Sequence, residues 1–87
     1  MYTVYILQDD ENRLYKGLTN NLSRRIQEHR RGKTKSTRNL KNVKVVYKEL
    51  HNNLETARRR ELYLKTAAGR RFIKTKIKTS DQIFMSQ

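Results

Sequence analysis

The sequence contains no cysteine and no proline, only three glycines, and no long run of apolar residues. Without cysteine, neither a disulfide framework nor a thiolate zinc site can strengthen a small core. The apolar stretch at residues 2–7 is too short for a secretory signal and lacks a basic leader, and no other apolar run could span a bilayer. We therefore expect a cytoplasmic protein that makes no membrane contact and is stabilised by packing alone.

Acidic residues are also scarce, and the resulting charge imbalance indicates a polyanionic partner. The chain has 21 Lys and Arg against 8 Asp and Glu, a formal net charge of +13. Phosphate backbones attract such a surface through counterion release, independently of base sequence and with strong salt dependence. We therefore expect a nucleic acid as the partner. On charge alone, a ribosome-bound or membrane-surface basic protein is the alternative.

The length of 87 residues limits the chain to one hydrophobic core. Hydrophobic residues make up 34% of the chain and charged residues 33%, so a compact fold requires well-placed apolar positions. No internal repeat or low-complexity segment divides the sequence. We expect a single domain over residues 1–87, with its core at about 2–75 and a C-terminal tail at about 76–87.

The first part of the chain predicts a β-hairpin. Residues 2–7 and 13–19 are two runs of strand-forming residues, and the segment between them is polar. A three-residue loop between the two strands would put Tyr5 opposite Tyr15, with both rings on one face of the sheet. The hairpin therefore predicts a shared aromatic surface.

A helix is expected after the hairpin, followed by a basic loop. Asn20 or Asn21 can cap the start of the helix, and Gly32 can end it. Residues 33–39 are polar and basic and show no apolar periodicity. We expect them to form a solvated, mobile loop.

The second half of the chain predicts one strand and two helices. Residues 43–50 alternate as a third strand, which places Val45 and Tyr47 on the same side. A second helix is expected over residues 54–68 with Gly69 as its C-terminal stop, followed by a short third helix and a weakly packed tail. The order β-β-α-β-α-α predicts an α/β (α+β) domain, a small antiparallel three-stranded sheet flanked by helices. The apolar positions of the third helix and tail are Phe72, Ile73, Ile77, Ile83 and Phe84.

One acidic residue breaks the pattern of the expected second helix. At about 100° per residue, Glu61 lies at the centre of an apolar, inward-facing stripe. Burying a carboxylate is costly unless it is paired, hydrogen-bonded or bound to a metal. A salt bridge to a basic side chain and a functional role are equally good explanations. The stripe consists of Leu54, Ala57, Glu61, Leu64 and Ala68.

Two side chains of the expected first helix can meet one ligand. Arg25 and His29 share a face one turn apart, whereas Arg24 and Arg30 belong to a solvated basic face. A partly buried, hydrogen-bonded histidine is the alternative for His29. In the second strand, Gly17 indicates a bulge or a place where another group approaches the backbone closely.

Four motifs occur in order along the chain. They are Thr3-Val4-Tyr5, Tyr15-Lys16-Gly17, a helix start from Thr19 to His29, and Ala57-Arg58-Arg59-Arg60-Glu61. Together they resemble the GIY-YIG nucleases over roughly residues 2 to 75, and the match is closest to short, standalone members. Each motif alone is weak, but four in this order and at these spacings are specific.

The resemblance implies a metal-dependent DNA endonuclease that hydrolyses phosphodiester bonds and uses no small-molecule cofactor. Glu61 would hold one divalent cation, Mg²⁺ or Mn²⁺, which bridges the scissile phosphate. Arg25 would stabilise the charge of the phosphorane, and His29 would be a further proton-transfer or phosphate-binding group. Tyr5 and Tyr15 would position or activate the attacking water.

The chain departs from the family pattern in three places. The first motif lacks the usual glycine and isoleucine, Lys16 replaces the aliphatic centre of the second, and no asparagine follows Asn53. Lys16 should project from the opposite sheet face to Tyr15. These departures motivate a second hypothesis, a catalytically degenerate module that binds nucleic acid without cutting it. A basic protein bound to ribosomal RNA is a third hypothesis, which the net charge alone supports.

DNA contacts are expected mainly from the basic loop beside the first helix. A single active site makes one cut, and the sequence has no obvious dimerisation stripe, so we expect a monomer. With no appended recognition domain in 87 residues, we expect selection by DNA shape, such as flaps or ends, in DNA repair or processing. The expected nucleic-acid-binding residues are Gly17, Arg24, Arg30, Lys33, Lys35 and Arg38.

Overall fold

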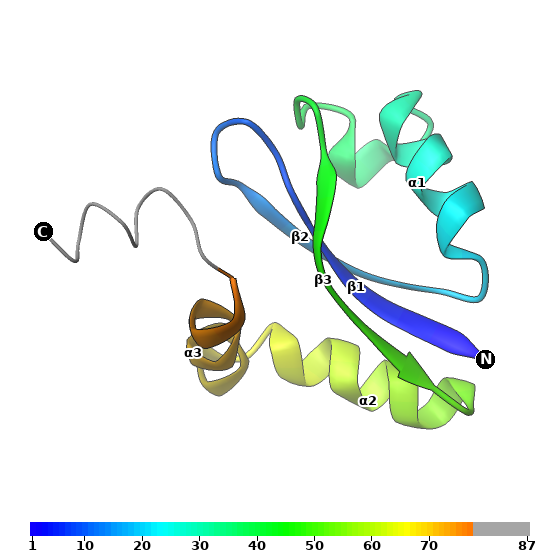
Figure 1. Cartoon of the computed structure of the whole chain (residues 1–87), viewed down its shortest axis with the longest axis vertical. Coiled ribbons are helices and arrows are strands. Elements are labelled where there is room, and N and C mark those ends of the chain that lie inside the picture. Colours follow the sequence, from blue (N-terminus) through cyan, green and yellow to red (C-terminus); the bar gives the residue numbers. More distant parts are fainter. Residues whose placement is uncertain (78–87) are drawn as a thin grey trace, which may run out of the picture.

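A three-stranded antiparallel sheet with helices on both faces forms the core of the computed structural model (Figure 1). The structure describes residues 1–77, so the expected contacts of Ile83 and Phe84 lie outside the described residues. The predicted fold class and the order β-β-α-β-α-α are confirmed. Within the described part of the chain, none of the helices is long and apolar enough to cross a membrane. The elements are β1 (Tyr2–Gln8), β2 (Leu14–Thr19), α1 (Leu22–Arg30), a 3-10 turn η1 (Lys35–Thr37), β3 (Lys44–His51), α2 (Leu54–Leu64) and α3 (Ala67–Lys76).

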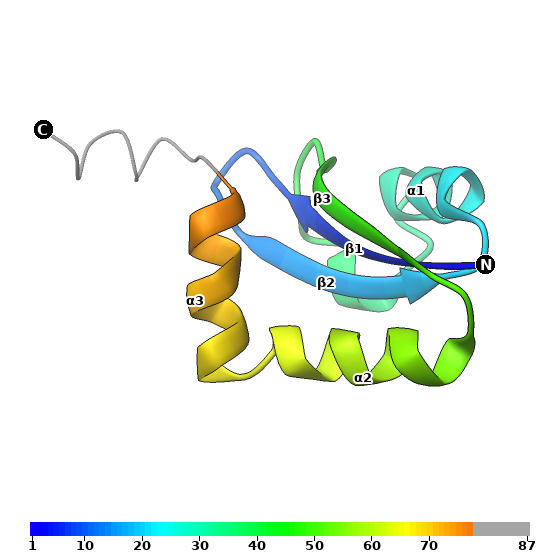
Figure 2. The same cartoon turned by 60° about the horizontal axis from the view of Figure 1, so that its bottom comes forward.

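Strand β1 is the central strand and is buried on both faces. The strand order is β2-β1-β3, and Figure 2 shows α1 on one side of the sheet and α2 on the other. Val4 and Ile6 pack with α2 and α3, whereas Tyr5 and Leu7 pack against α1. Because both faces are covered, β1 has no need of polar residues at alternate positions, and Thr3, itself buried, is the one residue of 2–7 that is neither aliphatic nor aromatic.

The hairpin register differs from the expected one by two residues. Tyr5 pairs with Gly17, and Tyr15 pairs with Leu7. The two tyrosine rings still share a face because side chains alternate with a period of two. The turn is longer than expected because the buried carboxylate of Asp9 accepts hydrogen bonds from backbone N–H groups within it, at 2.8 and 3.0 Å.

Strand β3 contains a bulge that the alternating pattern did not predict. Ile6 pairs with Tyr47 and Leu7 with Val45, so Val46 is an extra residue opposite the central strand. As a result Val45 packs on the α1 side of the sheet and Tyr47 on the α2 side. The expectation that these two side chains share a face is therefore wrong.

The basic segment at residues 33–39 is anchored rather than fully solvated. Gly32, at φ +72°, ends α1 as expected, and the N–H of residue 33 bonds back to the Glu28 carbonyl. The chain then forms η1 and buries the side chain of Thr37, which is 1% exposed. Thr37 is held because its hydroxyl lies 2.6 Å from Nδ1 of His29.

The helix expected over residues 54–68 is two helices that meet at a corner. The first ends at Leu64, and Thr66 caps the second by accepting a hydrogen bond from the N–H of Gly69. Gly69 therefore does not stop a helix. It lets α3 cross α2 closely, because a Cβ at this position would lie 2.0 Å from the Tyr63 carbonyl oxygen. The helical spacing of apolar residues continues from α2 into α3, so the sequence pattern could not show that the helix ends at Leu64.

A Gly69→Ala substitution tests this close crossing. In an ordinary helix interior, Gly to Ala stabilises by about 0.5–1 kcal/mol. Here we expect destabilisation of about 1–3 kcal/mol, because the added methyl meets backbone that cannot move aside cheaply. Urea unfolding of the two proteins measures the difference. A variant more stable than the parent would contradict the crossing.

Candidate active site

The two motif tyrosines lie side by side on the α1 face of the sheet. Tyr5 is fully buried and Tyr15 is half-buried, and their ring centroids are 6.4 Å apart. Gly17 makes room for them, since a Cβ there would lie 2.4 Å from Cζ and Oη of Tyr5 and 2.9 Å from Cε2 of Tyr15. The group that lies against Gly17 is therefore the Tyr5 ring of the protein itself.

A chain of hydrogen bonds connects Tyr5 to the segment after α1. The Tyr5 hydroxyl lies 2.9 Å from Nε2 of His29, and Nδ1 of His29 lies 2.6 Å from the Thr37 hydroxyl. Thr37 donates in turn to the Thr34 carbonyl at 3.5 Å. If Thr37 donates there, it accepts from the Nδ1–H of His29, and Nε2 then accepts from the Tyr5 hydroxyl. His29 is thus a buried histidine with both ring nitrogens hydrogen-bonded, and this arrangement also allows it to transfer a proton.

Burial and nearby charges set the protonation states of this chain. Burial raises the pKa of Tyr5 to about 12; Arg25 opposes that shift, and Tyr15 and Glu61 add to it. Burial, followed by the positive charge of Arg25, lowers the pKa of His29 below its usual 6.5. At neutral pH, Tyr5 is therefore protonated and His29 is neutral, as the hydrogen-bond directions require.

Arg25 extends from α1 beside the tyrosines. Asn21 caps this helix by accepting a hydrogen bond from the Arg24 N–H, which fixes where its first turn begins. The Arg25 guanidinium is one-third exposed, and its Nη1 lies 2.9 Å from Oε1 of Glu28, one turn further along. The guanidinium is therefore oriented by a carboxylate and still accessible to an anionic ligand.

Glu61 is a largely buried carboxylate on the inward stripe of α2. Ala57 and Leu64 on either side of it are fully buried, and the Glu61 side chain is 16% exposed. Its Oε2 lies 3.8 Å from Nζ of Lys65, whose side chain is half exposed. The same carboxylate is near enough to Tyr5 for its charge to affect the tyrosine pKa. This charge effect is the link between Glu61 and Tyr5 among residues 1–77, because Tyr5 packs against α1 and α2 lies on the other side of the sheet (Figure 2).

Arg60 and Glu49 orient α2, and sequence reasoning missed both. Nε of Arg60 donates to both carboxylate oxygens of Glu49 on β3, each at 3.0 Å. Its guanidinium also lies over the rings of Tyr63 and Phe72, 5.0 and 4.6 Å from their centroids. Adjacent helical residues are about 100° apart, so this anchor sets the direction of Glu61. Arg60 is the third of three consecutive arginines, and nothing in the sequence distinguishes it from the other two.

Four of the five side chains expected to be catalytic belong to the α1 side of the sheet. Tyr5 of β1, Tyr15 of β2 and His29 of α1 pack against one another, and Arg25 of α1 affects the pKa of Tyr5. Glu61 belongs to α2 on the other side, and its charge also affects the pKa of Tyr5. Thr37 joins Tyr5 and His29 through its hydrogen bond, although nothing in its basic segment marked it. The expected DNA-contacting side chains are exposed, and Arg38 is held by its hydrogen bond to the Gly32 carbonyl. Those exposed side chains are Arg24, Arg30, Lys33, Lys35 and Arg38.

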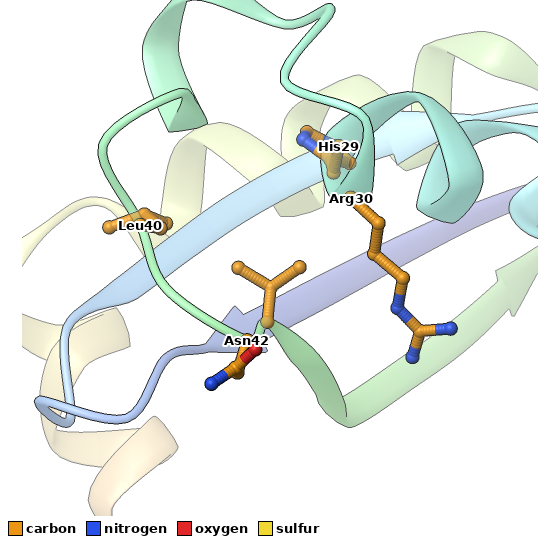
Figure 3. Close-up of a pocket in the computed structure, with 5 residues that line it drawn as sticks. His29, Arg30, Leu40 and Asn42 are labelled. Atoms are coloured by element: carbon orange, nitrogen blue, oxygen red, sulfur yellow. The ribbon is translucent and has the colours of Figure 1, made fainter.

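A cavity of about 390 Å³ adjoins the far end of α1 but shares only His29 with the catalytic candidates. His29 and Arg30 line it from α1, and Leu40 and Asn42 line it from the segment before β3 (Figure 3). Figure 3 shows the Arg30 guanidinium pointing away from the His29 ring. Arg30 is therefore placed for contacts outside the catalytic group.

Glu61 suits a metal that needs few protein ligands. Within residues 1–77, no group of three His, Asp or Glu side chains gathers into a cage for an ion. Mg²⁺ keeps several waters and accepts one or two carboxylates together with phosphate oxygens. A single, partly exposed carboxylate fits that ion better than Zn²⁺, which requires three or four side-chain ligands.

Comparison with known proteins places this site in a family. Residues 1–76 match the family described as the GIY-YIG catalytic domain. The chain therefore belongs to the GIY-YIG family, whose domain implies nuclease activity on DNA. Among its relatives are proteins of the UPF0213 group.

Two curated relatives and one solved structure illustrate the similarity. A UPF0213 protein of Clostridium perfringens is 46% identical over 66 residues, 75% of this chain and 71% of the relative. One from Staphylococcus haemolyticus is 38% identical over 72 residues, covering 82% and 88%. The solution NMR structure of a UPF0213 protein from Bacillus halodurans has a TM-score of 0.54 and 29% identity, covering 86% of this chain and 84% of that one.

A Gly17→Ala substitution tests the packing of Tyr5. The methyl would overlap the phenol, so we expect a loss of about 1–3 kcal/mol in stability and a displaced Tyr5–His29 hydrogen bond. Gly32→Ala is the matched control. A methyl group at this position meets no other atom, but the positive φ makes the substitution cost about 1–2 kcal/mol of stability. Urea unfolding and DNA cleavage are compared for both. Only Gly17→Ala should lose cleavage beyond its loss of stability; equal cleavage by the two would contradict the role of Gly17.

Proposed function

We propose that this domain is an endonuclease that hydrolyses phosphodiester bonds in DNA with one Mg²⁺ or Mn²⁺ ion at Glu61. The observation that supports it most is the buried Tyr5–His29 hydrogen bond beside Arg25, within reach of the Glu61 charge. The domain would act in the cytoplasm as a monomer, making one cut at a time in DNA repair or processing.

The hydrogen-bond chain can move a proton away from the attacking water. Water oxygen bonds to phosphorus and loses a proton to the Tyr5 oxygen, while Tyr5 passes its own proton to Nε2 of His29. Tyr5 is fully buried in the free domain, so this step requires DNA binding to open a path from the water to its hydroxyl. The bond from phosphorus to the leaving sugar oxygen breaks, and that oxygen takes a proton from solvent. Thr37 keeps Nδ1 of His29 protonated, so Nε2 is free to accept. Tyr5 is thus a relay, because its high pKa argues against a standing tyrosinate.

The other residues of the site act on charge. Arg25, whose guanidinium is oriented by Glu28, would stabilise the negative charge that grows on the phosphoryl oxygens. Tyr15 packs edge-on against His29, with ring centroids 5.1 Å apart, and so helps to hold the imidazole in place. A divalent ion bound at Glu61 would polarise the phosphoryl oxygen and the leaving group.

DNA would be held mainly through its phosphates. Lys33, Lys35 and Arg38 lie on the segment after α1, and Arg24 and Arg30 lie on the exposed side of that helix. Such side chains position a nucleic acid backbone without reading its bases. Selection by the shape of DNA, rather than by base sequence, follows from this kind of contact.

Replacing Glu61 tests the nuclease proposal directly. Branched, single-stranded and duplex DNA are incubated with the protein in Mg²⁺ or Mn²⁺, and products are resolved on denaturing gels. We expect Glu61→Gln to lower cleavage by about 10²–10³-fold, because an electrostatic contribution to the transition state is lost. Glu55→Gln, which removes an exposed acid from the same helix, should cleave normally.

A catalytically degenerate binding module would give a different result in the same assay. No substrate would be cut in either metal, DNA affinity would fall steeply with salt, and binding would be indifferent to Mg²⁺ and to Glu61→Gln. The absence of an asparagine after Asn53 is the feature that favours this alternative. If Glu61→Gln still cuts DNA in a metal-dependent way, both proposals are wrong: the domain is not a mere binding module, and its metal is not held by Glu61.

The lowered pKa of His29 predicts how cleavage depends on pH. The neutral imidazole is the active form, so kcat/KM should rise with pH through a midpoint below 6.5 and approach its plateau at neutral pH. Thr37→Val removes the partner of Nδ1 and should lower the plateau, and Thr37→Ser should restore it. A plateau reached only above pH 8 would show that His29 is not the proton acceptor.

A further inference from the structure

A second cavity, of about 310 Å³, opens between the first halves of α1 and α2. It lies at the end of the β1–β2 hairpin and shares Arg25 with the candidate active site, but none of the other four catalytic candidates lines it. It is thus next to the reaction centre without being part of it. The residues that line it are Tyr2, Leu18, Thr19, Asn20, Arg24, Arg25, Glu28, Leu54 and Arg58.

One side of this cavity carries a net positive charge. Three guanidinium groups face one carboxylate, and Glu28 is already shared between Arg24, at 3.8 Å, and Arg25, at 2.9 Å. Arg58 is exposed and has no ion-pair partner among residues 1–77. Guanidinium groups bind phosphate through paired hydrogen bonds, so this side is suited to a phosphodiester.

Apolar side chains also line the cavity and are accessible. Tyr2 and Leu18 are half-buried, and Leu54, one turn before Arg58 on α2, is 42% exposed. Nucleobases stack on aromatic and apolar side chains whatever their sequence. Guanidinium groups for a phosphate together with apolar side chains for a base are the chemistry that recognises a nucleotide.

The size of the cavity limits what can enter it. Ligand pockets typically measure about 300–1,000 Å³, so this one is at the lower limit and suits a single nucleotide. A base that is paired in a duplex is stacked between its neighbours and joined to its partner, and it cannot enter alone. The occupant must therefore be unpaired.

The cavity also lies on the line that a DNA strand would follow through the site. Leu54, Arg58 and Glu61 are spaced by four and three residues, so they form one stripe along α2. On the opposite side, Arg25 lines the cavity and also acts on Tyr5. A strand whose phosphate lies at Arg25 and Glu61 would bring the adjacent nucleotide to Arg58 and Leu54.

We propose that this cavity binds one unpaired nucleotide next to the scissile phosphate. The preferred substrate is then DNA with a displaced nucleotide at a flap, branch or frayed end, rather than continuous duplex. This inference rests on the proposed nuclease function for the position of the strand. Its test measures binding, so that the two can fail separately.

The experiment compares the affinity of the full chain for two labelled DNAs in the absence of divalent metal. One is a blunt duplex, and the other is the same duplex with a one-nucleotide flap; anisotropy gives both dissociation constants. We expect the flap to bind roughly tenfold more tightly, a gain typical of stacking one base on a protein surface. Arg58→Ala and Leu54→Ala should each remove most of this preference.

Two matched variants separate the cavity from general attraction. Arg59→Ala removes the same charge from the same helix, at a residue that pairs with Glu55 and does not line the cavity. Leu62→Ala removes an exposed leucine, 57% accessible, from a position on α2 that does not line the cavity. Both should keep the flap preference.

Equal affinity for the two DNAs would overturn the inference, as would equal losses from Arg58→Ala and Arg59→Ala. If the protein binds flap and duplex equally well and cuts both at the same rate, the proposed nucleotide cavity is overturned and the nuclease function stands. A flap preference that depends on Arg58 in a protein that cuts no DNA would support the cavity and reject the nuclease.

Discussion

Burial of β1 on both faces is the constraint on which the rest of the domain depends. Its side chains alternate between two separate cores, with Val4 and Ile6 toward α2 and α3 and Tyr5 and Leu7 toward α1. A slip of one residue would exchange the two sets, so the register is strongly specified. The position of the Tyr5 hydroxyl is therefore set by hydrophobic packing, before any polar contact is made.

The hydrogen-bonded part of the site lies between the sheet and α1. Tyr5 and His29 meet in a buried setting, where a hydrogen bond is stronger than in water and an unpaired group would be costly. Thr37 completes the chain from a segment that Gly32 turns back toward α1. On the other face, the Arg60–Glu49 pair anchors α2 to β3 and so sets the direction of Glu61. Each functional side chain thus has a structural neighbour that holds it.

Lys16, which replaces the usual aliphatic centre of the second motif, does not enter this group. It pairs with Ile6 across β1 and β2, on the face opposite to Tyr15, as the alternation of a strand predicted. Burial lowers its pKa, and the nearby charges of Arg70 and Lys65 lower it further. The departure from the family pattern therefore falls on the packing of the α2 side, away from the tyrosines and Arg25.

The sequence by itself determined the element order, the hairpin, the helix with Arg25 and His29, and the carboxylate of Glu61. These follow from local causes: strand-forming runs, asparagine caps, and the spacing of residues along one helix. Tertiary structure decided the hairpin register, the bulge at Val46 and the corner at Thr66, because each depends on which surfaces pack together. It also decided the partners of the site. The contacts that hold the site in place join residues far apart in the sequence, and local patterns do not reveal such contacts. Only the folded chain could therefore identify Thr37, Glu49 and Arg60.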